Sequence, residues 1–92
     1  MLVARIGGEV AGFVSVWAQS NFLHHLFVSP KHQRKGIGKA LISAIVCEFG
    51  LPMSLKCIKE NTQACRFYEK LGWQPREESI GPEGPYILYE LR

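Results

Sequence analysis

Between His32 and Leu41 the chain reads HQRKGIGKAL, with two glycines where a helical pattern begins. Glycine destabilises a helix interior by about 1 kcal/mol relative to alanine, so its presence here needs a reason. The first N–H groups of a helix have no partner within it, and the helix dipole favours an anion beside them. Glycines would let a pyrophosphate reach those N–H groups, with cations around it. The stretch from Gln33 to Lys39 therefore predicts an anion-binding loop, although a glycine-rich turn with solvated basic side chains has the same pattern.

Two well-known phosphate motifs do not fit this stretch. A P-loop would end at Gly38-Lys39, but Gln33 stands in place of its first glycine. Ala40 also replaces the Ser or Thr that holds magnesium in a P-loop. A Rossmann fingerprint requires a third glycine where this chain has Leu41. What remains is the pattern Q-x-x-G-x-G between a strand-like segment and a helix-like segment.

The elements that must position this loop follow from hydrophobic periodicity and turn residues. Alternation predicts strands, a 3–4 apolar spacing predicts helices, and Gly7-Gly8 predicts a tight hairpin turn. The predicted strands are 2–6, 9–19, 22–30, 53–59, 73–80 and 86–91, and the predicted helices are 38–49 and 62–71. The expected class is α/β (α+β), with a mixed, largely antiparallel sheet flanked by two main helices in the order βββ-α-β-α-ββ.

Composition limits the class of protein. The 92 residues are 47% hydrophobic with a net charge of +3, which predicts one folded domain over residues 1–92 and excludes a disordered chain. The chain has no aspartate, so a mechanism that needs one is excluded. Its three cysteines lack the spacing of a metal or redox motif, which predicts no metal site and free thiols in a cytoplasmic protein. No signal peptide and no membrane span are expected.

Two motifs in this sequence resemble those of one known family. LHHLFVSPKHQRKGIGKALI resembles the acyl-CoA signature of the GNAT superfamily of N-acetyltransferases, and NTQACRFYEKLGW resembles a second segment of that family, in the same order. The resemblance covers nearly all of the chain and begins at the second strand of the family. It implies a short form without the first strand and the two helices that follow it. The sheet edge so exposed favours a homodimer.

The resemblance also implies roles for particular residues. A strand of the family pairs its backbone with the pantetheine arm of the cofactor, as an added strand would, and supplies the oxyanion donor near Phe27 or Val28. The loop binds pyrophosphate, and an asparagine contacts the pantetheine region. The implied acetyl-CoA-binding residues are Leu26, Phe27, Val28, Gln33, Arg34, Lys35, Gly36, Ile37, Gly38, Lys39, Asn61 and Tyr68.

Tyr68 matches the general acid of many family members, although its place on an apolar helix face also fits the core. Phe22 stands where many members carry a glutamate base. His24 lies two residues further on, hence on the same face of a regular strand, and is the predicted base. His25 is expected to face the other way and to be buried or structural. Glu60 is a reserve candidate that would act through water.

The leading interpretation is an N-acyltransferase that moves an acetyl group from acetyl-CoA to an amine by direct attack in a ternary complex. The partners are then acyl-CoA and an amine acceptor whose identity the sequence does not reveal. An acyl-CoA sensor without turnover is the alternative. A nucleic-acid partner is disfavoured, because the basic patch of Arg34, Lys35 and Lys39 has no aromatic stacking platform beside it.

Overall fold

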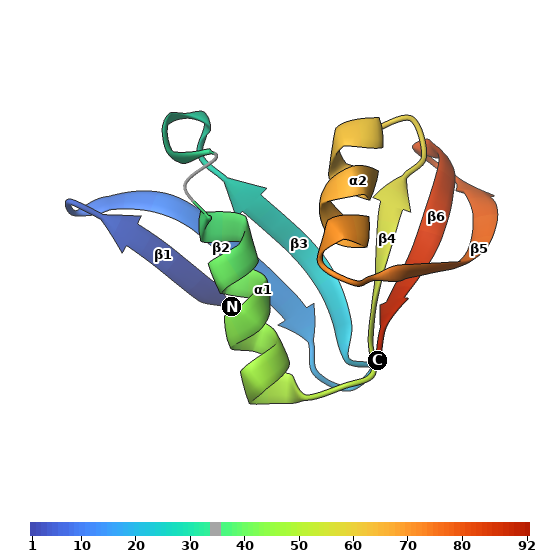
Figure 1. The fold of residues 1–92 in the computed structure, drawn as a ribbon, viewed down its shortest axis with the longest axis horizontal. Helices are drawn as coiled ribbons and strands as arrows, with labels where there is room; N and C mark the ends of the chain where they lie inside the picture. The colour runs from blue at the N-terminus through green and yellow to red at the C-terminus, as the bar shows by residue number, and fades with distance from the viewer. Residues whose placement is uncertain (34–35) are drawn as a thin grey trace. The chain divides into compact units, whose positions relative to one another are not determined.

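The computed structural model of the chain describes residues 1–33 and 36–92, and its elements follow the order βββ-α-β-α-ββ. Figure 1 shows them in two compact units, residues 1–50 and residues 51–92. The predicted α+β class and element order are confirmed. Arg34 and Lys35, both predicted to bind the cofactor, lie outside the described residues. None of the helices within the described ranges is long and apolar enough to span a membrane.

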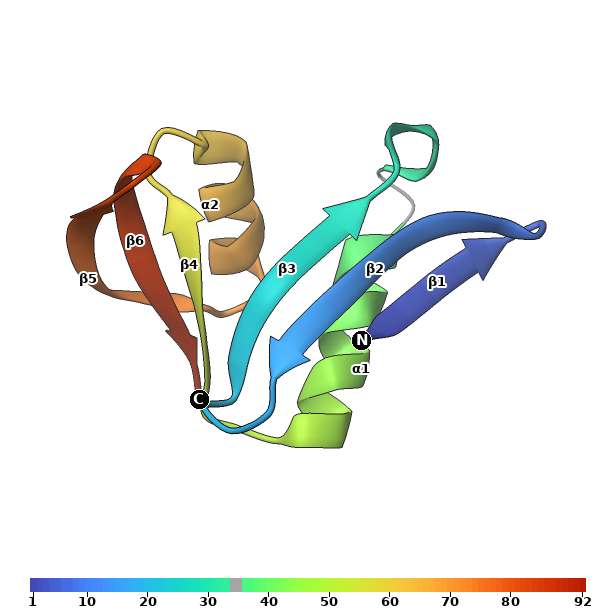
Figure 2. The same cartoon turned by 180° about the vertical axis from the view of Figure 1, so that it is seen from behind.

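The first unit is a three-stranded antiparallel sheet with one helix. Strands β1 (Leu2–Ile6), β2 (Glu9–Trp17) and β3 (Phe22–Val28) pair in sequence order, and helix α1 (Ile37–Phe49) covers one face (Figure 2). The core of this unit lies between sheet and helix, where Val14 is 0% and Ile45 is 1% exposed. Alternation along β2 and the 3–4 spacing along α1 put these apolar side chains on facing surfaces.

Strand β3 contains a bulge that changes which way its histidines point. Ser15 pairs with His25 and Val16 with Leu23, so His24 is an extra residue without a partner in the register. A bulge interrupts the alternation of side chains, and the rings of His24 and His25 lie only 4.1 Å apart. Both residues are exposed. The expectation that His25 faces away and is buried is therefore wrong, because it assumed a regular strand.

Strands β2 and β3 approach each other closely at Gly12. A Cβ placed there would lie 2.5 Å from the backbone oxygen of Phe27 and 3.4 Å from a methyl group of Leu41. The first distance is far inside van der Waals contact. Gly12 therefore allows the strand that leads into the predicted loop to lie against β2.

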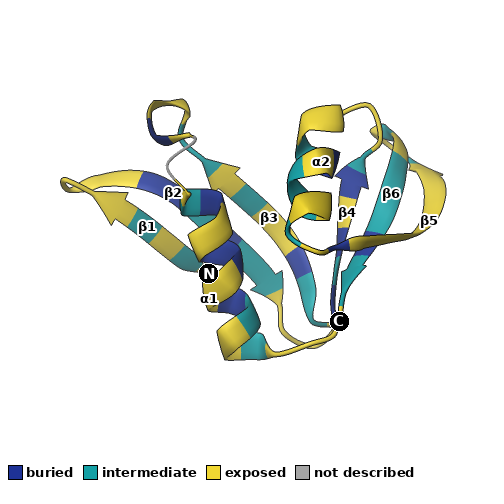
Figure 3. Ribbon diagram, viewed as in Figure 1, coloured by how far each residue is buried: buried dark blue, intermediate teal, exposed yellow. Residues whose placement is uncertain are grey.

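The second unit is built around strand β4 (Met53–Ile58). It pairs antiparallel with β6 (Gly84–Leu91), which pairs antiparallel with β5 (Gln74–Gly81), and helix α2 (Thr62–Lys70) joins β4 to β5. Its buried positions are shown in dark blue in Figure 3. The largest buried side chains are those of Trp73, Tyr89, Met53 and Leu55, each no more than 2% exposed. The second unit therefore has an apolar core of its own.

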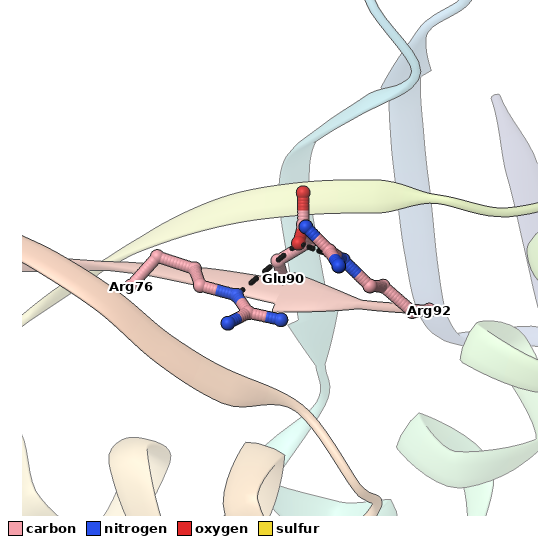
Figure 4. A network of polar contacts seen from close by, with 3 residues as sticks. All are labelled: Arg76, Glu90 and Arg92. Carbon is pink, nitrogen blue, oxygen red and sulfur yellow. Dashed lines mark hydrogen bonds and ion pairs between the residues drawn. The ribbon is translucent and has the colours of Figure 1, made fainter.

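The exposed surface of the second unit carries an ion-pair network, which Figure 4 shows. The Glu90 carboxylate accepts hydrogen bonds from Nε of Arg92 at 2.6 Å and Nε of Arg76 at 3.2 Å. The hydrogen bond from Arg92, with the charges of both arginines, lowers the pKa of Glu90 below its usual value. Such exposed pairs stabilise a fold only slightly.

Candidate functional site

Gly36 precedes helix α1 with a backbone conformation that favours glycine. Its φ is +77° and its ψ is 10°, in the left-handed region. A Cβ on Gly36 would meet no described protein atom within 4 Å, so packing does not demand a glycine there. No side chain of the described residues caps the helix, and its first turn contains no acidic residue. Among the described residues, no atom therefore fills the space beside Gly36 at the helix start.

The first turn of α1 supplies backbone donors. The N–H of Ala40 donates to the carbonyl oxygen of Gly36 at 3.0 Å, so the N–H groups of Ile37, Gly38 and Lys39 precede the first intrahelical bond. Gly38 is buried in this turn and Lys39 is exposed. The helix dipole adds partial positive charge at the same end. Such a set of groups suits an anion, and the binding of pyrophosphate here stays a prediction.

Gln33 connects this region to the end of β3. Its side-chain Nε2 lies 3.4 Å from the carbonyl oxygen of Val28, a long hydrogen bond. Leu26 and Val28 are half-buried, whereas Phe27 is 46% exposed and its ring lies 5.6 Å from that of Phe13. The structure thus brings together, in the first unit, the strand and the loop to which cofactor binding was assigned.

His24 belongs to an aromatic cluster that the sequence analysis missed. Trp17 pairs with Phe22 across the β2–β3 turn, and their rings lie 5.8 Å apart. The Trp17 ring is 4.1 Å from His24, which in turn is 4.1 Å from His25. Trp17 is 55% exposed. This cluster lies at the start of β3, whereas the basic residues follow the end of that strand, so the absence of an aromatic platform beside them stays a prediction.

Asn61 caps helix α2 in the second unit. Its side-chain Oδ1 accepts a hydrogen bond from the N–H of Ala64 at 3.1 Å. The expectation that a polar residue caps this helix is confirmed. A contact of Asn61 with the cofactor stays a prediction.

Tyr68 lies on the inner side of α2 among aromatic rings. Its ring centre is 6.0 Å from that of Trp73 and 6.3 Å from that of Tyr89. Burial, followed by the charges of Cys57 and Cys65, raises the pKa of Tyr68 to about 12. The hydroxyl is therefore protonated at any physiological pH. The ring contacts agree with a packing role for Tyr68, and its role as general acid stays a prediction.

Two buried thiols and a carboxylate lie near Tyr68. The Sγ atoms of Cys57 and Cys65 are 3.5 Å apart, and the Tyr89 hydroxyl donates to Glu69 Oε2 at 2.6 Å. Burial, together with the hydrogen bond to Cys65, raises the pKa of Cys57 to about 12. A thiol so weakly acidic is a poor nucleophile at neutral pH. The charges of both cysteines contribute to the raised pKa of Tyr68.

Residues 1–75 match the sequence model of the acetyltransferase (GNAT) domain. Because this match spans most of the chain, the protein belongs to the GNAT family. The resemblance noted from the two sequence motifs is thereby confirmed.

Two curated relatives agree with this assignment. The chain is 33% identical, over 93 residues and 96% of its length, to the 5-NmdU N-acetyltransferase of Pseudomonas phage PaMx11. It is 38% identical, over 66 residues and 72% of its length, to the peptidyl-lysine N-acetyltransferase YiaC of Escherichia coli (strain K12). The aligned regions span 66% and 44% of the lengths of these relatives.

Solved structures share the fold at lower identity. Ard1 from Thermoplasma volcanium matches with a TM-score of 0.84 and 22% identity, covering 97% of this chain and 67% of that one. A protein of Bacillus anthracis str. Ames assigned as a streptothricin acetyltransferase, crystallised with acetyl coenzyme A, matches with a TM-score of 0.87 and 21% identity. That match covers 98% of this chain and 60% of the other.

Proposed function

We propose that this chain transfers an acetyl group from acetyl-CoA to an amine by direct attack, without an acyl-enzyme. Acetyl-CoA supplies an activated thioester when it is bound. The nitrogen–carbon bond forms as the carbon–sulfur bond breaks, the amine loses a proton, and the sulfur leaves as the CoA thiol. The two curated relatives are named for different acceptors, 5-NmdU and a peptidyl-lysine, so the proposal names an amine and no narrower class.

The observation that carries this proposal is the open start of α1. Gly36 leaves free space where a Cβ would lie, and three backbone N–H groups precede the first helical hydrogen bond. Gln33, Lys39 and the backbone of Leu26, Phe27 and Val28 complete the proposed binding surface in the first unit. The cationic side chains of Arg34 and Lys35 belong to the same proposed surface.

Tyr68 would act at the sulfur. Its pKa of about 12 lies roughly three units above that of an ordinary thiol, so complete proton transfer to a thiolate is uphill. The hydroxyl would therefore stabilise the departing sulfur chiefly as a hydrogen-bond donor. This is a smaller role than that of a full general acid, and it follows from the burial of the side chain.

His24 would act at the amine. An amine of pKa about 10.4 is almost wholly protonated at neutral pH, so a base must accept its proton. His24 is exposed on β3, where the rings of Trp17 and His25 hold it. The ring of Trp17 would then lie under the group that carries the amine.

Calorimetry with matched glycine variants tests the cofactor site. Gly36 and Gly50 stand at opposite ends of α1, with φ values of +77° and +78° and no described atom within 4 Å of an added Cβ. Gly36→Ala should weaken acetyl-CoA binding at least tenfold because the methyl group blocks the pyrophosphate. Gly50, with a ψ of -177°, lies in a region that is nearly restricted to glycine, so Gly50→Ala strains the other end of the helix more strongly than Gly36→Ala strains its start, yet it should leave the affinity unchanged. Equal losses in both variants would reduce Gly36 to a structural residue.

Thiol release separates the enzyme from the acyl-CoA sensor. An enzyme should release free thiol from acetyl-CoA when a suitable amine is present, whereas a sensor should bind acetyl-CoA and release none. A panel of small amines and lysine peptides is the appropriate probe. Binding without release across the panel would favour the sensor.

A further inference from the structure

His32 ends the short 3-10 turn η1 (Pro30–His32), and only 11% of its side chain is exposed. Within residues 1–33 and 36–92, neither ring nitrogen has a hydrogen-bond partner. The Glu9 carboxylate lies nearby, with Oε2 at 3.7 Å from His32 Nε2. That distance is too long for a hydrogen bond but suits an ion pair. The ring is thus buried beside a carboxylate to which it is not hydrogen-bonded.

The charge of His32 decides what this contact does. A neutral imidazole leaves a buried donor and a buried acceptor unsatisfied, which is unfavourable. A protonated ring has two donors and is attracted to Glu9, so the contact can shorten into a charge-assisted hydrogen bond. Histidine is the side chain that ordinarily changes charge between about pH 5 and pH 8. The Glu9–His32 contact is therefore suited to respond to pH.

The position of His32 links this contact to Gln33, the first residue of the predicted anion-binding loop. The N–H of Ser29 donates to the carbonyl oxygen of Ala11 on β2 at 2.7 Å, and the N–H of His32 donates to that of Ser29 at 2.8 Å. Glu9 begins the same strand β2, and Gln33 follows His32 directly. The turn η1 is thus connected to β2 by a backbone hydrogen bond at Ser29 and by the side-chain contact of His32 with Glu9.

Within the described residues, the ion pair recorded for this ring is the one with Glu9. Strand β2 packs against η1, and Glu9 is the charged residue of that strand. Lys31 is the other basic residue of η1 and is exposed. Among the described residues, a change in the charge of His32 therefore acts on the Glu9 carboxylate.

We propose that His32 is a positioning residue whose protonation draws in Glu9, holds η1 and the following Gln33 against β2 and strengthens CoA binding. This proposal rests on the proposed function, because Gln33 belongs to the proposed CoA-binding surface. A turn that is already held in place needs less ordering when the ligand binds.

Nuclear magnetic resonance tests the link without any ligand. The amide signals of Gly36 and Gly38 should follow the titration of the His32 ring in the wild type. In Glu9→Gln they should no longer do so, because the carboxylate that responds to the ring charge is gone. Glycine signals that titrate alike in both proteins would overturn the proposal.

Calorimetry with CoA tests the consequence at about pH 6 and about pH 8. Variants are compared at the same pH, since the phosphates of CoA titrate in this range too. Near pH 6 the wild type should bind about two- to fivefold more tightly than Glu9→Gln, and near pH 8 the two should bind alike. Glu48→Gln is the matched control, because Glu48 is the other glutamate of residues 1–50 and lies exposed near the end of α1.

The outcomes distinguish this inference from the proposed function. If the ratio of the wild-type CoA affinity to that of Glu9→Gln is the same at both pH values, the proposed role of His32 is overturned. Absence of CoA binding by the wild type at both pH values would remove the proposed cofactor site, and the glycine titration would still decide the ion pair. His32→Asn, checked for folding by circular dichroism, should show the weak affinity of Glu9→Gln at both pH values; wild-type affinity near pH 6 would contradict the proposal.

Discussion

The two units differ in the surroundings that they give to the groups with proposed roles. Around the start of α1, side chains are absent and the backbone is accessible, with Gly36 in the left-handed region and open space beside it. Around Tyr68, side chains are dense, and burial changes the acidity of the group. An anion can be held by exposed N–H groups and a helix dipole, whereas control of a proton requires desolvation.

The distribution of charge shows the same contrast. Residues 1–50 contain five Lys or Arg and two Glu, whereas residues 51–92 contain six of each. The whole net charge of +3 therefore resides in the first unit, which contains the proposed pyrophosphate loop. A binding defect should map to the first unit, and a defect in sulfur chemistry should map to the second.

The largest effect is expected from filling the backbone site. The double variant Gly36→Val, Gly38→Val should lower the affinity for acetyl-CoA about 100-fold or more, because branched side chains cover the N–H groups that bind the anion. Calorimetry measures the affinity, and circular dichroism confirms that the variant is folded. A folded double variant that binds acetyl-CoA like the wild type would show that the start of α1 is not the binding site, and the proposed division of roles between the two units would fail.

Tyr68→Phe should slow the reaction and leave cofactor binding nearly intact, whereas the double glycine variant loses binding. We expect the rate of thiol release to fall about 10²-fold, near the low end for a proton donor, while the affinity for acetyl-CoA changes little. The rate should also hold through about pH 10 in the wild type, because the pKa of Tyr68 is raised to about 12. Steady-state kinetics against pH measures both. If loss of the hydroxyl weakens binding and leaves the rate intact, Tyr68 belongs to the binding surface.

The free energy of unfolding at alkaline pH should depend on two buried groups of the second unit, Tyr68 and Cys57. The folded-state pKa of Tyr68 is raised from 10.0 to about 12, so its stabilising contribution is complete below about pH 10 and is lost as pH rises to about 12. The Cys57 thiol, raised from 9.0 to about 12, acts in the same direction from a lower pH. Urea unfolding should show the free energy of unfolding falling less steeply above pH 10 in Tyr68→Phe. Identical slopes would mean that burial does not hold the proton on Tyr68.

The smallest effect separates two roles of Asn61. Asn61→Ala removes the cap of α2 and should lower the free energy of unfolding by about 1 kcal/mol. Asn61→Ser keeps a capping oxygen and should retain nearly all of the stability. If Asn61→Ser nevertheless weakens acetyl-CoA binding, the amide contacts the cofactor as predicted. If neither variant affects binding, capping is the whole role of Asn61.

Several expectations remain predictions of the sequence. These are the single domain over residues 1–92, the homodimer, the cytoplasmic location and the roles of the cofactor residues. Analytical ultracentrifugation of the purified chain tests the homodimer. The roles of the residues are decided by the variants above.

The sequence alone determined the element order, the glycine segment before α1, the cap of α2 and the place of Tyr68 on an apolar helix face. These features are local, since periodicity, turn residues and capping act over a few neighbouring residues. The tertiary structure decided the bulge at His24, the aromatic cluster around Trp17, the approach of Gly12 to Phe27 and the contact of His32 with Glu9. Each of these depends on strand register or on packing between residues distant in the chain, which no short pattern encodes.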